Sequence, residues 1–429
     1  MFKHPLLKDD GAQTDRQTPV VWNTPESAAV LPDQPDPRLA GAPAHVGQLF
    51  ATALDDIRSN FIQIDGQSYF GAGKLFGPVV YTRDIAFSGL LGLNRLYPRL
   101  MDASLRYTRE VRRNIGWKVP RNNDLSPLGL PAETLDCDET AFMRRFLTNS
   151  FARRTDDIVW IWATHDLYTA NPDLADWDWL LNTGEEFFKT FYQHLHDRST
   201  GLYRGQASFI DIHYSTDNPS SGYPLDWPVL DCINIFAAST NALYAKAAGA
   251  LSDAATRLGK TQAARAWLEC SQQLAASIRD QLIHDDGRVA YFLRPDGTRE
   301  SRTEALGASL CVLLDVFASD NDARQTLDTL AWNEHGLPLI QPPWDNDHFY
   351  HNHASWPFVE AFYCRAASKL GDADAIDRGI AQLMTSCTDN GTFHEVTDVR
   401  TGERTGSTRQ LWTASAFAGL CLDRYPPPE

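Results

Sequence analysis

Three short, almost wholly apolar stretches of this chain each follow a polar cluster. The clusters and the stretches after them are Arg153–Asp157 and Ile158–Ala163, Tyr350–His353 and Trp356–Ala367, and Thr408–Gln410 and Leu411–Cys421. A helix that is apolar on every side must be buried, and charged side chains at the end of a buried helix are unusual enough to indicate a specific role. The pattern therefore predicts a pocket built where several buried helices begin.

Helical segments of two kinds alternate along the chain. Amphipathic segments with charged faces, such as Tyr97–Arg113, Trp177–His196 and Lys260–Gln281, alternate with the apolar stretches. Two concentric rings require this alternation, because an inner helix meets core on every side and an outer helix shows one face to water. About a dozen segments give six pairs, which predicts an all-α fold, an (α/α)6 toroid of six helical hairpins. A helical solenoid is the structural alternative, but no fixed-period repeat is present.

Long loops rich in Gly, Pro and aromatic residues separate several helical segments, as at 117–137, 201–227 and 336–353. Loops of this length in a compact domain are usually functional. We expect them on one rim of the barrel, around the mouth of the pocket. Residues 1–43 are rich in Pro, Asp, Gln and Ala and predict an extended N-terminal arm, whereas residues 44–429 are expected to form a single catalytic barrel domain.

The composition excludes several classes of partner. The chain has 429 residues and a net charge of −16, and both nucleic acids and anionic membranes require clustered Lys and Arg. No run approaches the roughly 18 apolar residues of a membrane span, and the N-terminus opens no apolar signal segment. The seven Cys have no C-x-x-C spacing, which favours reduced thiols in a cytoplasmic protein over a zinc site or a disulfide framework.

Asp156 and Asp157 are the first candidates for chemistry, and two interpretations are open. Thr155 is a suitable N-cap, and acids in a first helical turn complement the helix dipole. Alternatively, one of the two carboxyl groups lies in an aromatic pocket walled by Trp160 and Trp162. Desolvation there would raise its pKa and allow it to donate a proton.

Glu395 is the second candidate, in a turn-rich region that continues through Thr401 and Gly402 to Gln410 and Trp412. It is either an ordinary loop glutamate or a general base that activates water. Two carboxyl groups roughly 6.5–9.5 Å apart leave room for that water and define an inverting glycosidase.

Further polar and aromatic residues are candidates to bind a substrate. Arg83 and Asp84 form either an ion pair that ties a loop to a helix start or a fork that grips sugar hydroxyls. His351 and His353 lie one residue apart, but no acidic or Cys partner has the spacing of a helix-borne metal site, so no metal is expected. The other candidates for hydrogen bonds or stacking with a small carbohydrate are Tyr81, Trp160, Tyr350, Asn352, Trp356, Gln410 and Trp412, with Tyr203, Arg204, Asp226 and Trp227 as weaker candidates on the rim.

Taken in order, these clusters resemble the motifs of the six-hairpin glycosidases over roughly residues 80 to 423. That group includes alkaline/neutral invertases, the glucosidase part of glycogen-debranching enzymes and the cellobiose phosphorylase group. The similar segments are Tyr81–Asp84 (Trp-x-Arg-Asp), Asp156–Trp160 (Asp-x-x-x-Trp), Tyr350–Pro357 (Tyr-His-Asn-Gly-x-x-Trp-Pro) and Glu395–Trp412 (Glu-Tyr-x-x-x-x-Thr-Gly, then Gln-x-Trp). The chain departs from these motifs at His353 and Val396, where the family has Gly and Tyr.

The resemblance implies an inverting, exo-acting glycoside hydrolase that cleaves a terminal sugar from a di- or oligosaccharide. It implies Asp156 as the general acid, with Asp157 as the alternative, and Glu395 as the general base, with no cofactor. Three other functions fit the same fold: a glycoside phosphorylase, a sugar epimerase or isomerase that uses His351 and His353, and a catalytically inactive carbohydrate-binding barrel.

Overall fold

The computed structural model describes residues 21–22, 37–64, 66–76, 80–112, 118–119, 133–134, 136, 155–190, 192–212, 220–387 and 391–427. Of the predicted arm at 1–43, only residues 21–22 and 37–43 are therefore described. Residues 139–152, whose sequence pattern predicts a further helix, lie outside the described residues. Within them, no helix has both the length and the apolar character needed to cross a lipid bilayer.

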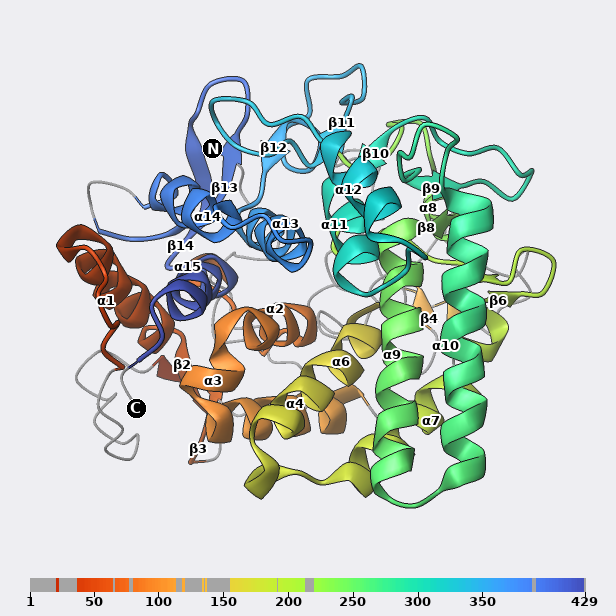
Figure 1. The fold of residues 1–429 in the computed structure, drawn as a ribbon, viewed down its shortest axis with the longest axis horizontal. Helices are drawn as coiled ribbons and strands as arrows, with labels where there is room; N and C mark the ends of the chain where they lie inside the picture. The colour runs from red at the N-terminus through yellow and green to blue at the C-terminus, as the bar shows by residue number, and fades with distance from the viewer. Residues whose placement is uncertain are drawn as a thin grey trace.

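An inner ring of helices forms the centre of the molecule (Figure 1). Within the described part of the chain its members are α2 (Thr82–Ser88), α6 (Thr155–Ala170), α9 (Ala238–Arg257), α11 (Ala305–Leu313), α13 (Pro357–Lys369) and α15 (Leu411–Arg424). Each helix contacts the next one along the chain, and α15 contacts α2. These contacts close the ring.

A second set of helices packs outside this ring (Figure 1). It consists of α1 (Ala44–Arg58), α4 (Pro98–Arg112), α7 (Trp177–Thr190), α10 (Thr261–Leu282), α12 (Asp320–Asp328) and α14 (Ala375–Met384). Burial follows the predicted pattern: α15 is buried continuously from Leu411 to Leu422, whereas α10 buries only Leu274, Ile278 and Leu282. The all-α (α/α)6 toroid predicted from the sequence is confirmed.

Short strands lead directly into three inner helices. These are β8 (Phe236–Ala237) before α9, β10 (Thr303–Glu304) before α11 and β12 (Ala354–Ser355) before α13. The sequence pattern over residues 230–257 predicts one helix, but strand β8 separates α9 from a short helix α8 (Val229–Ile233). Strand β12 pairs with β13 (His394–Asp398), which pairs with β14 (Arg404–Thr408) in an antiparallel sheet.

The remaining described elements are short. The strands are β1 (Val21–Trp22), β2 (Phe61–Ile64), β3 (Gln67–Phe70), β4 (Lys118–Val119), β5 (Glu133–Thr134), β6 (His196–Asp197), β7 (Leu202–Tyr203), β9 (Phe292–Leu293) and β11 (Ile340–Gln341). The helical turns are η2 (Lys74–Phe76), the π-helix η3 (Gly89–Leu93), α3 (Asn94–Leu96), η6 (Pro172–Leu174) and η7 (Tyr192–His194).

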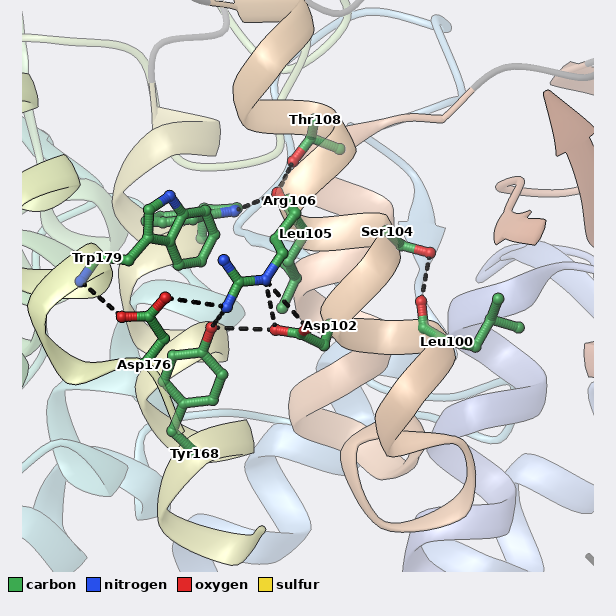
Figure 2. Close-up of polar contacts among 10 residues, drawn as sticks. Leu100, Asp102, Ser104, Leu105, Arg106, Thr108, Tyr168, Asp176 and Trp179 are labelled. Carbon is green, nitrogen blue, oxygen red and sulfur yellow. Dashed lines mark hydrogen bonds and ion pairs between the residues drawn. The ribbon is translucent and has the colours of Figure 1, made fainter. Parts of the chain in front are cut away.

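A partly buried polar cluster joins outer and inner helices (Figure 2). The guanidinium of Arg106 on α4 donates to Asp102 (3.0 Å), to the Tyr168 hydroxyl on α6 (2.9 Å) and to Asp176 ahead of α7 (3.4 Å). It also lies 4.1 Å from the ring centroid of Trp179. One side chain thus holds α4, α6 and the start of α7 together, and the cluster has a structural role away from the starts of the inner helices.

Ring closure between the end of the chain and the α2 region depends on glycine. A Cβ on Gly419 of α15 would lie 1.7 Å from the Leu91 carbonyl oxygen of η3. A Cβ on Gly92 would lie 2.8 Å from the Ser415 carbonyl oxygen. The two helical backbones therefore touch, because neither glycine has a side chain to separate them.

We expect Gly419→Ala to lower the free energy of unfolding by about 3 kcal/mol, since backbone atoms on both sides resist the added methyl group. Gly47→Ala is the matched control, because Gly47 lies in α1 and a Cβ there meets nothing within 4 Å. That change should raise stability by about 0.5–1 kcal/mol through helix propensity. Urea denaturation measures both, and equal effects of the two substitutions would contradict the proposed close contact.

Candidate active site

A pocket lies where several inner helices begin. It is lined by Phe76, Tyr81, Arg83, Asp84, Phe209, Asp211, Tyr350, His351, Trp356, Glu395 and Trp412, and it encloses about 400 Å³ including its mouth. The lining residues come from the start of α2, the segment after β7, the loop before α13, strand β13 and the start of α15. The pocket predicted from polar clusters at helix starts is therefore present.

Glu395 lies on β13 at an irregularity of the sheet, because the register against β14 shifts between His394 and Val396. Bulges of this kind redirect a side chain and are common beside active sites. The carboxylate is 1 % exposed and accepts two hydrogen bonds of 2.9 Å, from the Tyr350 hydroxyl to Oε1 and from the Ser407 backbone N–H to Oε2. Gly406 makes the second bond possible, since a Cβ there would lie 2.4 Å from Glu395 Oε2.

Burial raises the pKa of Glu395 to about 8. The hydrogen bonds from Ser407 and Tyr350 oppose this shift, because they stabilise the charged carboxylate. The negative charges of Asp84 and Asp211 add to it. At neutral pH, Glu395 therefore holds a proton.

Arg83 is the positive charge of this pocket. It lies in the first turn of α2, is 6 % exposed, and forms an ion pair of 3.1 Å with Asp211. Burial disfavours the charged guanidinium, but the carboxylates of Asp211, Asp156 and Asp84 outweigh it and raise the pKa of Arg83 above its ordinary value. Arg83 therefore stays charged among the acids that surround it.

Aromatic rings form the remaining wall. The His351 imidazole stacks on Trp356 with 5.4 Å between ring centroids, and Trp356 meets Trp412 edge to face at 5.7 Å. Phe209 packs edge-on against Trp356 at 5.2 Å. Flat apolar rings beside polar groups are the surface to which the C–H faces and hydroxyl edges of a sugar are complementary.

The structure brings many of the predicted site residues together. Those that line the pocket are Tyr81, Arg83, Asp84, Tyr350, His351, Trp356, Glu395 and Trp412. Gln410 lies directly behind it, fully buried. With its amide oxygen turned toward Trp412, it accepts a hydrogen bond of 3.0 Å from the indole Nε1.

Asp156 and Asp157 occupy the first turn of α6 and are buried, but neither belongs to the pocket lining. Asp156 acts electrostatically on Arg83 from behind the lining. Asp211 lines the pocket instead, beside Arg83, and sequence reasoning missed it. Phe76 and Phe209 were missed as well. Asp211 stands alone between Ile210 and Ile212 in a long loop, so no polar cluster singled it out.

The other predicted binding residues lie elsewhere. Trp160 is buried between the rings, where its indole donates to the Leu105 carbonyl of α4 (2.9 Å) and packs against Trp179. Tyr203 stacks on Tyr244 at 3.9 Å, and Arg204 pairs with Asp197 at 2.7 Å. The last three residues are Asp226, which is exposed, Trp227, which packs against Phe292, and Asn352, which bonds the backbone of Trp344.

The two histidines do not act as a pair. His351 stacks in the pocket wall, whereas the Nε2 of His353 lies 2.7 Å from the Asn346 carbonyl oxygen. Proton transfer by a His351–His353 pair, the basis of the epimerase alternative, would need both rings at one substrate. Their different surroundings therefore weaken that alternative.

Comparisons with known proteins agree with this picture. Residues 143–413 match the family model described as the mannosylglycerate hydrolase MGH1-like glycoside hydrolase domain. Among solved structures, a glycosidase aligns over 90 % of this chain and 99 % of its own, with 15 % identity and a TM-score of 0.61. No curated protein matches the sequence.

Two further solved structures share the fold. A metal-independent α-mannosidase from Streptococcus pneumoniae aligns over 88 % of this chain and 93 % of its own, with 13 % identity and a TM-score of 0.59. A GH78 family rhamnosidase from Bacillus sp. GL1 aligns over 91 % of this chain and 36 % of its own, with 15 % identity and a TM-score of 0.59. At such low identity the likeness concerns the fold.

We expect Tyr350→Phe to raise the pKa of Glu395 further above 8, because the lost hydroxyl donor favours the charged carboxylate. Asp211→Asn should lower it, because a nearby negative charge disappears. Carbon-13 NMR titration of labelled glutamate, assigned with Glu395→Gln, measures both shifts. Tyr168→Phe is the matched control, since that hydroxyl bonds Asp102 and not Glu395; a shift of Glu395 in this variant would contradict the local origin of the effect.

Proposed function

The chain belongs to the MGH1-like glycoside hydrolase family, and on that premise we propose that it is an inverting, exo-acting hydrolase. It would remove the terminal sugar of a di- or oligosaccharide. The observation that carries the proposal is that Glu395 and Asp211 line the same pocket. Arg83, which pairs with Asp211, and several aromatic rings line this pocket as well.

In the proposed reaction, Glu395 is the general base. Its carboxylate takes a proton from a water molecule as the water oxygen attacks the anomeric carbon. The carboxyl group of Asp211 gives its proton to the glycosidic oxygen as the bond from that oxygen to the anomeric carbon breaks. Attack from the face opposite the leaving group inverts the anomeric configuration.

The charges of the pocket favour this use of two carboxyl groups. Asp84, Asp211 and Glu395 face a single guanidinium on the described lining, so one proton is readily retained among them. At neutral pH that proton resides on Glu395, and it must move to Asp211 before the two groups can act as base and acid. The reactive pair thus keeps one proton, so kcat/KM should fall as the pH rises through the pKa of Glu395, about 8, and the pair loses that proton.

Asp211 is preferred to Asp156 and Asp157 as the acid because of its position. A general acid must reach the glycosidic oxygen, directly or through one water. Asp211 lines the pocket, whereas Asp156 influences it through the charge on Arg83. We assign Asp156 the role of holding Arg83 in its charged, oriented state.

The remaining lining residues suit the recognition of a terminal sugar. Arg83, Asp84 and His351 offer donors and acceptors for hydroxyl groups, and Trp356 and Trp412 offer apolar faces. A pocket lined by helix starts, loops and a strand fits one end of a glycan better than the middle of a chain. This shape supports exo action.

Hydrolysis is also favoured over phosphorolysis. A phosphate nucleophile would need positive charge, and the only guanidinium on the described pocket lining already pairs with Asp211. The ionised carboxylates of Asp84 and Asp211 on the same lining would repel a phosphate dianion. Sugar release that depends on inorganic phosphate would overturn this preference.

We expect Asp211→Asn and Glu395→Gln each to lower kcat by about 10²–10⁴-fold, the range for a lost general acid or base. Asp156→Asn should lower it roughly tenfold, because it acts through Arg83. An activated aryl glycoside should restore much of the rate of Asp211→Asn and none of that of Glu395→Gln, since a good leaving group needs no acid. The opposite rescue pattern would reverse the two roles, and Asp226→Asn, at an exposed position, is the matched control.

A panel of disaccharides followed by proton NMR should show one substrate whose freshly released sugar has the anomeric configuration opposite to that of the bond cleaved. Spectra taken within the first minutes precede mutarotation of the product. Release with retained configuration would contradict the inverting mechanism while leaving the family assignment intact. Cleavage inside a long glycan before any terminal sugar appears would contradict exo action.

A further inference from the structure

A tight turn at Ser220–Tyr223, outside the pocket lining, contacts both the segment that carries Asp211 and the loop that carries Tyr350 and His351. We propose that Gly222 in this turn is a positioning residue, which sets the placement of Asp211 relative to Glu395. The inference rests on the proposed function, because it assigns these two carboxyl groups to the reaction. It adds a residue that touches neither the substrate nor the reacting carboxyl groups.

On the first side, the turn packs against Ile210, the neighbour of Asp211. A Cβ on Gly222 would lie 2.0 Å from Ile210 Cγ2, so only glycine allows the observed contact. The Tyr223 hydroxyl accepts a hydrogen bond from the Ala207 backbone N–H at 3.0 Å and lies 3.5 Å from the Ile210 carbonyl oxygen. The turn therefore fixes both ends of the short segment 207–210 that leads into Asp211.

On the second side, the turn is bonded to the loop before α13. The His351 backbone N–H donates to the Ser221 hydroxyl at 3.0 Å. The next residue toward the N-terminus, Tyr350, donates its hydroxyl to Glu395. A chain of two hydrogen bonds and one peptide unit thus connects the turn to the proposed base.

The turn cannot easily move to relieve a clash. Its Gly222 carbonyl oxygen accepts hydrogen bonds from the Tyr291 hydroxyl and from the Trp344 indole, each at 3.0 Å. Trp344 is in turn fixed by Asn352, whose Oδ1 accepts from its backbone N–H at 2.6 Å. A methyl group on Gly222 must therefore displace Ile210, and with it the backbone of Asp211.

Displacement of one reacting group by about 1 Å can cost about 10²-fold in rate. We expect Gly222→Ala to lower kcat about 10²-fold with KM changed less than about threefold, since Trp356 and Trp412 remain in place to bind the sugar. Ile210→Leu removes the Cγ2 atom that the new methyl group would meet. The double variant Gly222→Ala with Ile210→Leu should recover at least tenfold of the lost kcat, and Ile210→Leu alone should stay within about threefold of the wild type.

Crystal structures of the wild type and of Gly222→Ala, with melting temperatures of all variants, complete the experiment. Gly47→Ala, an unhindered glycine substitution, serves as the control for the change of residue type. An unchanged kcat in Gly222→Ala, or a double variant no faster than Gly222→Ala, would overturn the proposal. If the wild type cleaves no glycoside, the proposed function fails. The crystal structures then still test the positioning role, because they show whether the methyl group moves Asp211 relative to Glu395. An Asp211 that has not moved would overturn that role.

Discussion

One buried guanidinium allows several acids to face the same pocket. Arg83 lies in the first turn of α2 and interacts with Asp84, Asp156 and Asp211, two of which line the pocket. Without a positive charge, desolvated carboxylates at close quarters would each take up a proton or repel one another. With it, part of the group stays ionised while Glu395 holds the retained proton. The chemistry proposed for the pocket depends on this unequal distribution of protons among the carboxyl groups.

The toroid supplies the geometry for this arrangement. Inner helices begin at a common end, so their first turns and the loops before them converge from many directions on a small volume. Helix N-termini also carry partial positive charge, which helps acids such as Asp84 and Asp156 to remain there. The long loops and the β12–β13–β14 sheet then add groups that no helix start could provide, above all Glu395 with its two hydrogen bonds.

The sequence predicts the ring architecture well because an inner helix is buried on every side, and its sequence is therefore an apolar stretch without a polar face. It also predicts the pocket residues that precede such stretches, including Arg83, His351 and Trp412. Because these stretches are apolar on every face, they do not indicate which side of a helix faces the pocket. Trp160 shows the consequence: it follows Asp156 by one turn, yet it points between the rings toward α4 and α7. Asp211 was missed for another reason, since its placement comes from tertiary contacts of a loop with the turn at Ser220–Tyr223.

The contact between Gly419 of α15 and Leu91 of η3 joins segments separated by more than three hundred positions. Contacts between distant segments form late, because the intervening chain must first lose its freedom. During synthesis, the helices from α2 to α14 can emerge and pair locally, but the ring stays open until residues 411–424 have left the ribosome. Trp412 belongs to α15, so the pocket is incomplete until this helix has packed against α2 and α13. Until then, the growing chain exposes the apolar surfaces of α2 and α13 that α15 covers in the folded protein.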